Sequence, residues 1–164
     1  MPSLPRLLAP FLPAVVLAAG ALPASAEARA FHEYRQLPKP APPVVGKRAL
    51  RAARTFLGTP YAWGGESRGG LDCSGLVVVS FRKVGRRLPH YTGALWRLGR
   101  PVRKGAKLHV GDLVFFRLSG GVPGHVGIYA GRGRYIHSPS SGEHVRYGLM
   151  RDRADDFAGA RRLR

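Results

Sequence analysis

Helix-forming segments come first in this sequence and strand-forming segments follow, and this order restricts the possible folds more than any other feature. Residues 47–57 place apolar side chains on one side of a helix and basic ones on the other. Residues 73–81 form an apolar run after a potential helix cap, Asp72, which favours a second helix, although three successive valines also suit a strand. Four later segments are short, rich in β-forming residues and separated by Gly, Pro and Ser, namely residues 111–116, 125–130, 134–137 and 144–147. The order predicts an α+β fold with helices packed on one side of a small curved antiparallel sheet.

The first 26 residues have the pattern of a secretory signal peptide. Arg6 precedes an apolar stretch over residues 7–22, and the small residues Ala24, Ser25 and Ala26 suit a cleavage site. An uncleaved membrane anchor is the alternative, but three prolines weaken a long helix there, so we expect no stable membrane span. We therefore expect an exported protein that works in the periplasm or at the cell wall.

Residues 27–46 read as a linker, because they hold few large apolar side chains and four prolines between positions 38 and 43. The linker leaves residues 47–164 as one working domain. That length is enough to bury a substantial core, and no internal repeat divides it.

The chain is strongly basic, with 27 Lys and Arg residues against 9 Asp and Glu residues and a formal net charge of +18. Such an excess favours contact with anionic partners such as nucleic acid, phospholipid or wall polymer. Nucleic acid is disfavoured because the charge is spread along the chain, no recognition motif is present and the export signal directs the protein away from chromosomes. The sequence gives no prediction of oligomeric state.

Cys73 is the only cysteine, which excludes an intramolecular disulfide and any Cys-rich metal site. It directly follows Asp72 at the predicted helix start, where free backbone N–H groups and the helix dipole lower the pKa of a thiol. This position predicts a thiolate nucleophile. A buried, unreactive cysteine is the alternative that position alone leaves open.

A thiol nucleophile needs a base within hydrogen-bond distance, and six histidines are candidates: His32, His90, His109, His125, His137 and His144. A hairpin loop at residues 131–133 would pair Ala130 with Arg134 and Ile128 with Ile136. This register is preferred because it turns both isoleucines toward the core.

The same register places His125 and His137 diagonally on the opposite face, with only Gly127 between them. His125 is then predicted to accept the Cys73 proton, and His137 to fix the orientation and tautomer of its ring. The alternative is a metal site on the two imidazoles, which is disfavoured because carboxylate ligands are scarce and a zinc ion would consume the nucleophile. The other four histidines are expected to be solvated.

Four ordered segments, residues 58–65 (GTPYAWGG), 72–75 (DCSG), 111–116 (GDLVFF) and 125–129 (HVGIY), resemble the NlpC family of bacterial cell-wall cysteine peptidases. The resemblance implies a papain-like fold over residues 47–164. It also implies catalytic roles for three residues and substrate-site roles for three more: Cys73 as nucleophile, His125 as base and His137 as its orienting partner, with Tyr61, Asp72 and Ser74 shaping the substrate site.

The sequence departs from the family pattern at two places. His90, Tyr91 and Thr92 stand where a basic residue and small hydroxyl residues are usual, and Ser138 stands where alanine is frequent. The resemblance therefore gives no prediction of substrate preference at that edge.

By resemblance, the chain hydrolyses peptide bonds in peptidoglycan stem peptides, typically the bond from the γ-carboxyl of D-glutamate to diaminopimelate, through an acyl-enzyme and without a metal or other cofactor. Its charge is expected to assist binding to anionic wall or envelope polymers. The competing interpretation is a catalytically silent, basic wall-binding or scaffold protein.

Overall fold

The computed structural model describes residues 44–118 and 123–163. The predicted signal peptide and the part of the linker before Val44 lie outside the described residues. Helix α2 spans Val44–Arg54, so it begins inside the segment assigned to the linker. Among the described residues, no helix combines the length and the apolar character needed to cross a membrane.

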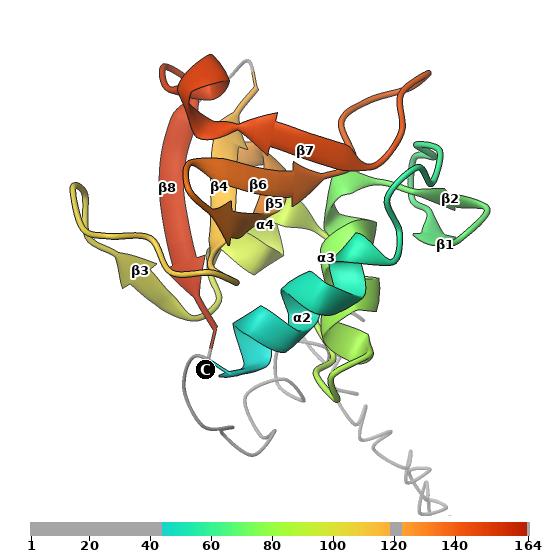
Figure 1. Ribbon diagram of the computed structural model, residues 1–164, viewed down its shortest axis with the longest axis horizontal. Coiled ribbons are helices and arrows are strands. Elements are labelled where there is room, and N and C mark those ends of the chain that lie inside the picture. Colours follow the sequence, from blue (N-terminus) through green and yellow to red (C-terminus); the bar gives the residue numbers. More distant parts are fainter. Residues whose placement is uncertain (1–43, 119–122, 164) are drawn as a thin grey trace, which may run out of the picture.

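A six-stranded antiparallel sheet forms the centre of the fold (Figure 1). Its strands follow the order β3-β8-β4-β5-β6-β7, with β3 at Arg100–Val102, β4 at Leu113–Arg117, β5 at Pro123–Gly131, β6 at Arg134–His137, β7 at Arg146–Leu149 and β8 at Phe157–Arg162. The remaining elements are β1 at Glu66–Ser67, β2 at Gly70–Leu71, α3 at Cys73–Arg82, α4 at Thr92–Trp96 and a short 3-10 helix at Met150–Arg153.

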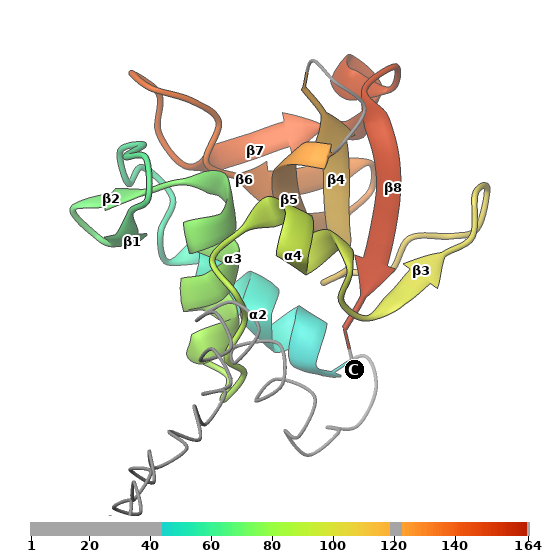
Figure 2. The same ribbon diagram turned by 180° about the vertical axis from the view of Figure 1, so that it is seen from behind.

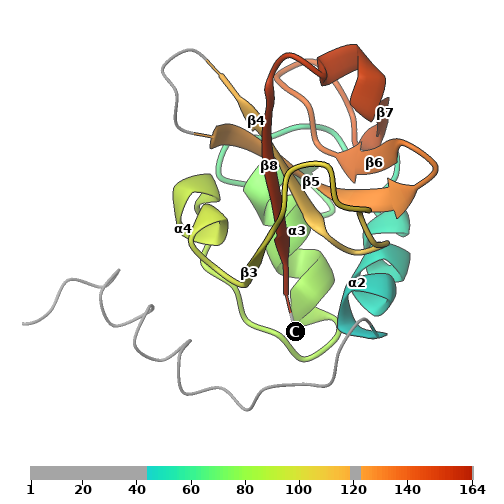
Figure 3. The same cartoon turned by 90° about the vertical axis from the view of Figure 1, so that its left-hand side faces the viewer.

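The helices lie together against the sheet, as the order of elements predicts. Figure 2 shows α3 and α4 below the strands, and Figure 3 shows α3 between α2 and α4. Leu113 and Phe115 of β4 belong to the core shared with these helices, whereas Val114 and Phe116 pack in a second cluster with Tyr135. This alternation follows from the two-residue period of a strand. The predicted α+β fold is confirmed.

The predicted hairpin register is right at its centre and wrong at its loop. Ile128 lies opposite Ile136, as predicted, but Arg134 pairs with Gly131 rather than with Ala130. A bulge between Tyr129 and Gly131 absorbs one residue. The sequence also gave no signal for α4, β3 or β8, and β8 takes a place between β3 and β4.

Candidate active site

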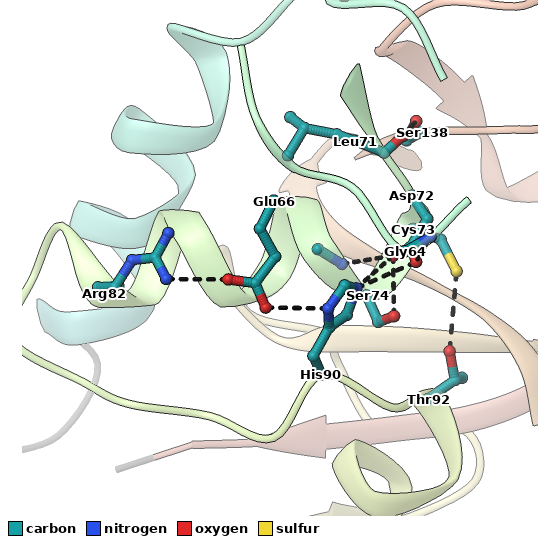
Figure 4. Close-up of polar contacts among 11 residues, drawn as sticks. Gly64, Glu66, Leu71, Asp72, Cys73, Ser74, Arg82, His90, Thr92 and Ser138 are labelled. Carbon is teal, nitrogen blue, oxygen red and sulfur yellow. Dashed lines mark hydrogen bonds and ion pairs between the residues drawn. The ribbon is translucent and has the colours of Figure 1, made fainter. Parts of the chain in front are cut away.

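Asp72 caps the N-terminus of α3, as the sequence predicts. Its carboxylate accepts hydrogen bonds from the backbone N–H of Gly75 at 2.6 Å, the hydroxyl of Ser74 at 2.9 Å and the backbone N–H of Gly64 at 2.9 Å (Figure 4). Nε2 of His90 lies 2.9 and 3.0 Å from its two oxygens. Burial, the largest single effect, opposes ionisation, but the combined hydrogen bonds hold the pKa of Asp72 below its ordinary value.

Gly75 lets the loop before α3 lie directly on the first turn of that helix. A Cβ atom at Gly75 would lie 2.0 Å from the carbonyl oxygen of Gly65, and one at Gly65 would lie 2.4 Å from that of Gly70. The glycines of this segment therefore serve backbone-to-backbone packing. They hold Tyr61 and its neighbours close to the residue that follows the cap.

Cys73 is the first residue of α3, and its sulfur faces Thr92 and strand β5. Sγ lies 3.7 Å from Oγ1 of Thr92 (Figure 4), and the backbone N–H of Val126, the residue after His125, also hydrogen-bonds the sulfur. Burial raises the pKa of the Cys73 thiol, and the charge of Asp72 adds to the rise, whereas bonds from Thr92, Val126 and Ser74 lower it. The prediction of a lowered thiol pKa is therefore wrong, because desolvation outweighs the helix start.

His125 and His137 form a buried pair on the sheet face opposite the helices. Nε2 of His125 lies 2.8 Å from Nδ1 of His137, and the two residues are 4% and 5% exposed. Gly127 makes room for this pair, because a Cβ there would lie 3.3 Å from Cβ of His137 and 2.7 Å from the ring of Tyr135. The predicted contact between the two imidazoles is present.

Both histidines favour the neutral state. Burial lowers the pKa of His125 to about 3, with further lowering from His137 and Arg153. Burial likewise lowers the pKa of His137 to about 4, with contributions from Arg146 and Arg153. Since the thiol pKa is raised, the site at neutral pH holds an uncharged thiol and two uncharged imidazoles.

The hydrogen bond between the histidines restricts their tautomers. If Nδ1 of His125 is to accept a proton, Nε2 carries the hydrogen and donates it to Nδ1 of His137. The hydrogen of His137 then lies on Nε2, which is buried and has no hydrogen-bond partner among the described residues. One arrangement of protons thus leaves His125 ready to act as a base.

Ser138 links the end of strand β6 to the segment that precedes α3. Its hydroxyl donates a 2.6 Å hydrogen bond to the carbonyl of Leu71, which directly precedes the Asp72 cap. Ser138 is fully buried and adjacent to His137. This departure from the family pattern therefore ties the strand carrying His137 to the segment that leads into Cys73.

The three residues assigned to the substrate site lie around the cap. Ser74 is buried, and its hydroxyl donates to Asp72. Burial raises the pKa of Tyr61, and the charges of Cys73 and Asp72 raise it further, which locates the phenol near both. The backbone N–H of Tyr61 also bonds the carbonyl of Glu143 at 2.8 Å.

Sequence reasoning missed Thr92 and His90. His90 was expected to be solvated, but its side chain is 23% exposed and bridges Glu66 and Asp72. Both residues lie in the segment where the sequence departs from the family pattern, and that departure was the available signal. Within residues 44–118 and 123–163, no group of three or more His, Cys, Asp or Glu side chains is arranged to hold a metal ion.

Two curated proteins are similar to this chain in sequence. The chain is 37% identical to peptidoglycan endopeptidase RipA of Mycobacterium tuberculosis over 67% of its length and 26% of that protein, and 36% identical to murein DD-endopeptidase MepH of Escherichia coli over 71% of its length and 45% of that protein. It thus spans less than half of these relatives.

Two solved structures are similar. One is an NlpC/P60 family protein from Bacillus cereus, with a TM-score of 0.68 and 34% identity over 79% of this chain and 42% of that one. The other is the NlpC/p60 domain of peptidoglycan hydrolase SagA, with a TM-score of 0.64 and 33% identity over 72% of this chain and 98% of that domain. The NlpC/P60 family pattern matches residues 58–156, and the chain therefore belongs to the NlpC/P60 family.

Proposed function

We propose that this protein is an exported cysteine endopeptidase that hydrolyses peptide bonds in the stem peptides of peptidoglycan. The observation that carries the proposal is the 2.8 Å hydrogen bond between His125 and His137. It lies beside Val126, the residue after His125, whose backbone N–H hydrogen-bonds the sulfur of Cys73. Family membership and the names of RipA and MepH support the same reaction class. Cys73 is the nucleophile in this proposal, His125 the base and His137 the positioning residue.

The uncharged resting state favours proton transfer during attack rather than a preformed thiolate. The Cys73 sulfur attacks the peptide carbonyl while its proton passes to Nδ1 of His125, and an S–C bond forms. Backbone N–H groups at the start of α3 hold the oxyanion, and Tyr61 assists. His125 then gives the proton to the leaving amine, so that the C–N bond breaks and an acyl-enzyme remains. Water activated by His125 releases the acid and restores the thiol.

Asp72 and Ser74 support this chemistry from the helix start. They fix the first turn of α3 through the cap, and we propose that the same turn shapes the substrate site. Because the 2.6 Å bond from Gly75 orients that turn, small movements of the cap would misplace the oxyanion donors.

The scissile bond we propose is the D-γ-glutamyl–diaminopimelate bond. MepH is named a murein DD-endopeptidase, so a DD bond is the alternative. Digestion of defined muropeptides followed by mass spectrometry separates the two products. Cys73→Ala and His125→Ala are expected to abolish turnover, whereas His144→Ala, a change at an exposed histidine, leaves it intact. Full binding to walls without any cleavage would favour the silent scaffold protein instead.

The basic face of α2 supports binding to anionic wall polymers. Four exposed cations line a shallow hollow on this helix, namely Lys47, Arg48, Arg51 and Arg54. None of the four has an ion-pair partner within residues 44–118 and 123–163. We propose that this face holds the enzyme near its substrate by charge attraction.

A further inference from the structure

We propose that His90 is a positioning residue: its protonated ring holds the Asp72 cap and offsets the negative charge beside Cys73, so that at a given pH the thiol is more reactive with a charged residue at position 90 than with a neutral one. The proposal rests on the function given above, in which Cys73 is the nucleophile. It concerns a histidine that touches neither the sulfur nor the histidine pair in the contacts described.

Each ring nitrogen of His90 faces a carboxylate. Nδ1 lies 2.9 Å from Oε1 of Glu66, and Nε2 lies 2.9 Å from Oδ1 of Asp72 (Figure 4). A neutral imidazole carries one N–H group and can donate to only one of these carboxylates. The protonated ring donates to both, and charge-assisted bonds of this kind are stronger than neutral ones. The geometry therefore fits the imidazolium form.

The charges around the cap balance only when His90 is protonated. Arg82 lies 2.9 Å from the second oxygen of Glu66, so the set contains two carboxylates and two cations. Loss of the His90 proton leaves the set with one uncompensated negative charge. Burial is the main reason that the pKa of Cys73 is raised, and the charge of Asp72 adds to it. An uncompensated Asp72 therefore opposes formation of the thiolate more strongly.

His90 also packs on the turn that carries the nucleophile. Its Nε2 lies 3.2 Å from the position of a Cβ built on Gly75, in the first turn of α3. The other ionisable group near the cap is Tyr61, whose pKa burial raises with help from Cys73 and Asp72. Tyr61 is uncharged at neutral pH. In the ion pairs of Glu66 and Asp72 within residues 44–118 and 123–163, the cations are His90 and Arg82.

Alkylation of the single thiol by iodoacetamide tests the proposal without any peptidoglycan substrate. The rate is measured from about pH 5 to about pH 10 in the wild type, His90→Arg and His90→Gln. Arginine stays charged across this range and glutamine is never charged. Each variant should give a logarithmic rate that rises with pH at constant slope, with His90→Arg faster by about three- to tenfold, as expected for a charge that shifts the thiol pKa by roughly half a unit to one unit.

The wild type is expected to follow His90→Arg at acidic pH and to approach His90→Gln at alkaline pH. A wild-type profile parallel to that of His90→Gln at every pH would overturn the proposal. If either variant fails to fold, the wild-type alkylation profile alone gives the test, because a stretch of reduced slope is expected within the measured range and a straight line of constant slope would overturn the proposal.

Muropeptide digestion in parallel separates the two proposals. A wild-type alkylation profile that moves from that of His90→Arg to that of His90→Gln, without hydrolysis, would sustain the role of His90 and reject the proposed peptidase. Hydrolysis combined with parallel profiles would do the reverse.

Discussion

Nε2 of His125 and Nδ1 of His137 lie 2.8 Å apart, and both residues are buried. Two buried rings in this contact hold each other's orientation, since turning either one breaks the bond. The base of the proposed reaction is therefore aligned before substrate binds. The hydrogen bond, rather than a charge on His137, performs this alignment, because burial lowers the pKa of His137 to about 4.

His137→Ala should lower kcat by on the order of 10² or more, because His125 loses the partner that fixes its tautomer. His137→Asn should keep more activity, since the amide oxygen can accept from Nε2 of His125. The measurement is steady-state hydrolysis of a defined muropeptide, with His144→Ala as the control. Equal rates for the Ala and Asn variants would show that His137 only fills space.

The thiol titration should report the raised pKa of Cys73. We expect the alkylation rate to level off only above the ordinary thiol range, because burial opposes the thiolate. Thr92→Val keeps the side-chain shape and removes one bond to the sulfur, so it should slow alkylation at a given pH by about three- to tenfold. A thiol that is fully reactive below pH 7, roughly one unit or more under the ordinary value, would contradict this prediction.

The histidine pair should make stability fall in mild acid. In the unfolded chain both histidines take up protons near the ordinary histidine pKa of 6.5, whereas the folded pKa values are about 3 and about 4. Between these limits the unfolded state binds more protons, so the free energy of unfolding decreases as pH falls through this window and levels off below it. Their contribution is fully present above the window.

Thermal unfolding of the wild type and His137→Asn across the same pH window checks this linkage. Asparagine does not titrate, so the variant should show a shallower loss of Tm with acid. His144→Ala serves as the control, because it removes an exposed histidine. Identical slopes in all three proteins would mean that the buried pair does not cause the acid sensitivity.

The features of this site that could be predicted from the sequence are those that depend on local sequence patterns. Asp72 precedes an apolar helical run, so the cap and the position of Cys73 could be predicted from neighbours in the chain. The pairing of Ile128 with Ile136 could be predicted because apolar side chains must share a face. These two local results already bring His125 next to His137.

The remainder depends on contacts between distant segments. The raised pKa of Cys73 results from burial by the rest of the fold, which a helix-start argument leaves out. Glu66 and His90 meet only because β1 and the segment before α4 pack on the same helix. Strand β8 gave no clear signal, since it holds two glycine-flanking alanines and two arginines instead of an alternating apolar pattern.

Ser138→Ala should lower the free energy of unfolding by about 0.5–1.5 kcal/mol, because the buried carbonyl of Leu71 loses the hydroxyl donor and keeps only the backbone N–H of Ala62 at 3.1 Å. Denaturant unfolding measures the change. Ser140→Ala is the matched control, since the Ser140 hydroxyl bonds Glu143 at an exposed site. A variant as stable as the wild type would show that the link between β6 and the Asp72 segment contributes nothing.

The basic face of α2 should govern binding to isolated cell walls. The double variant Arg48→Glu/Arg51→Glu reverses two exposed charges in the α2 hollow, and we expect binding to weaken by about tenfold or more at low salt. Arg103→Glu/Lys104→Glu makes the same change in net charge at another exposed site and should weaken binding less. Co-sedimentation with walls at increasing salt measures both, and the wild type should be released as salt rises because exposed charges are screened. A loss of wall binding confined to the α2 variant would identify this helix as the wall-binding surface. Equal losses in the two variants would assign the binding to overall charge. Binding that does not depend on salt would exclude an electrostatic contact.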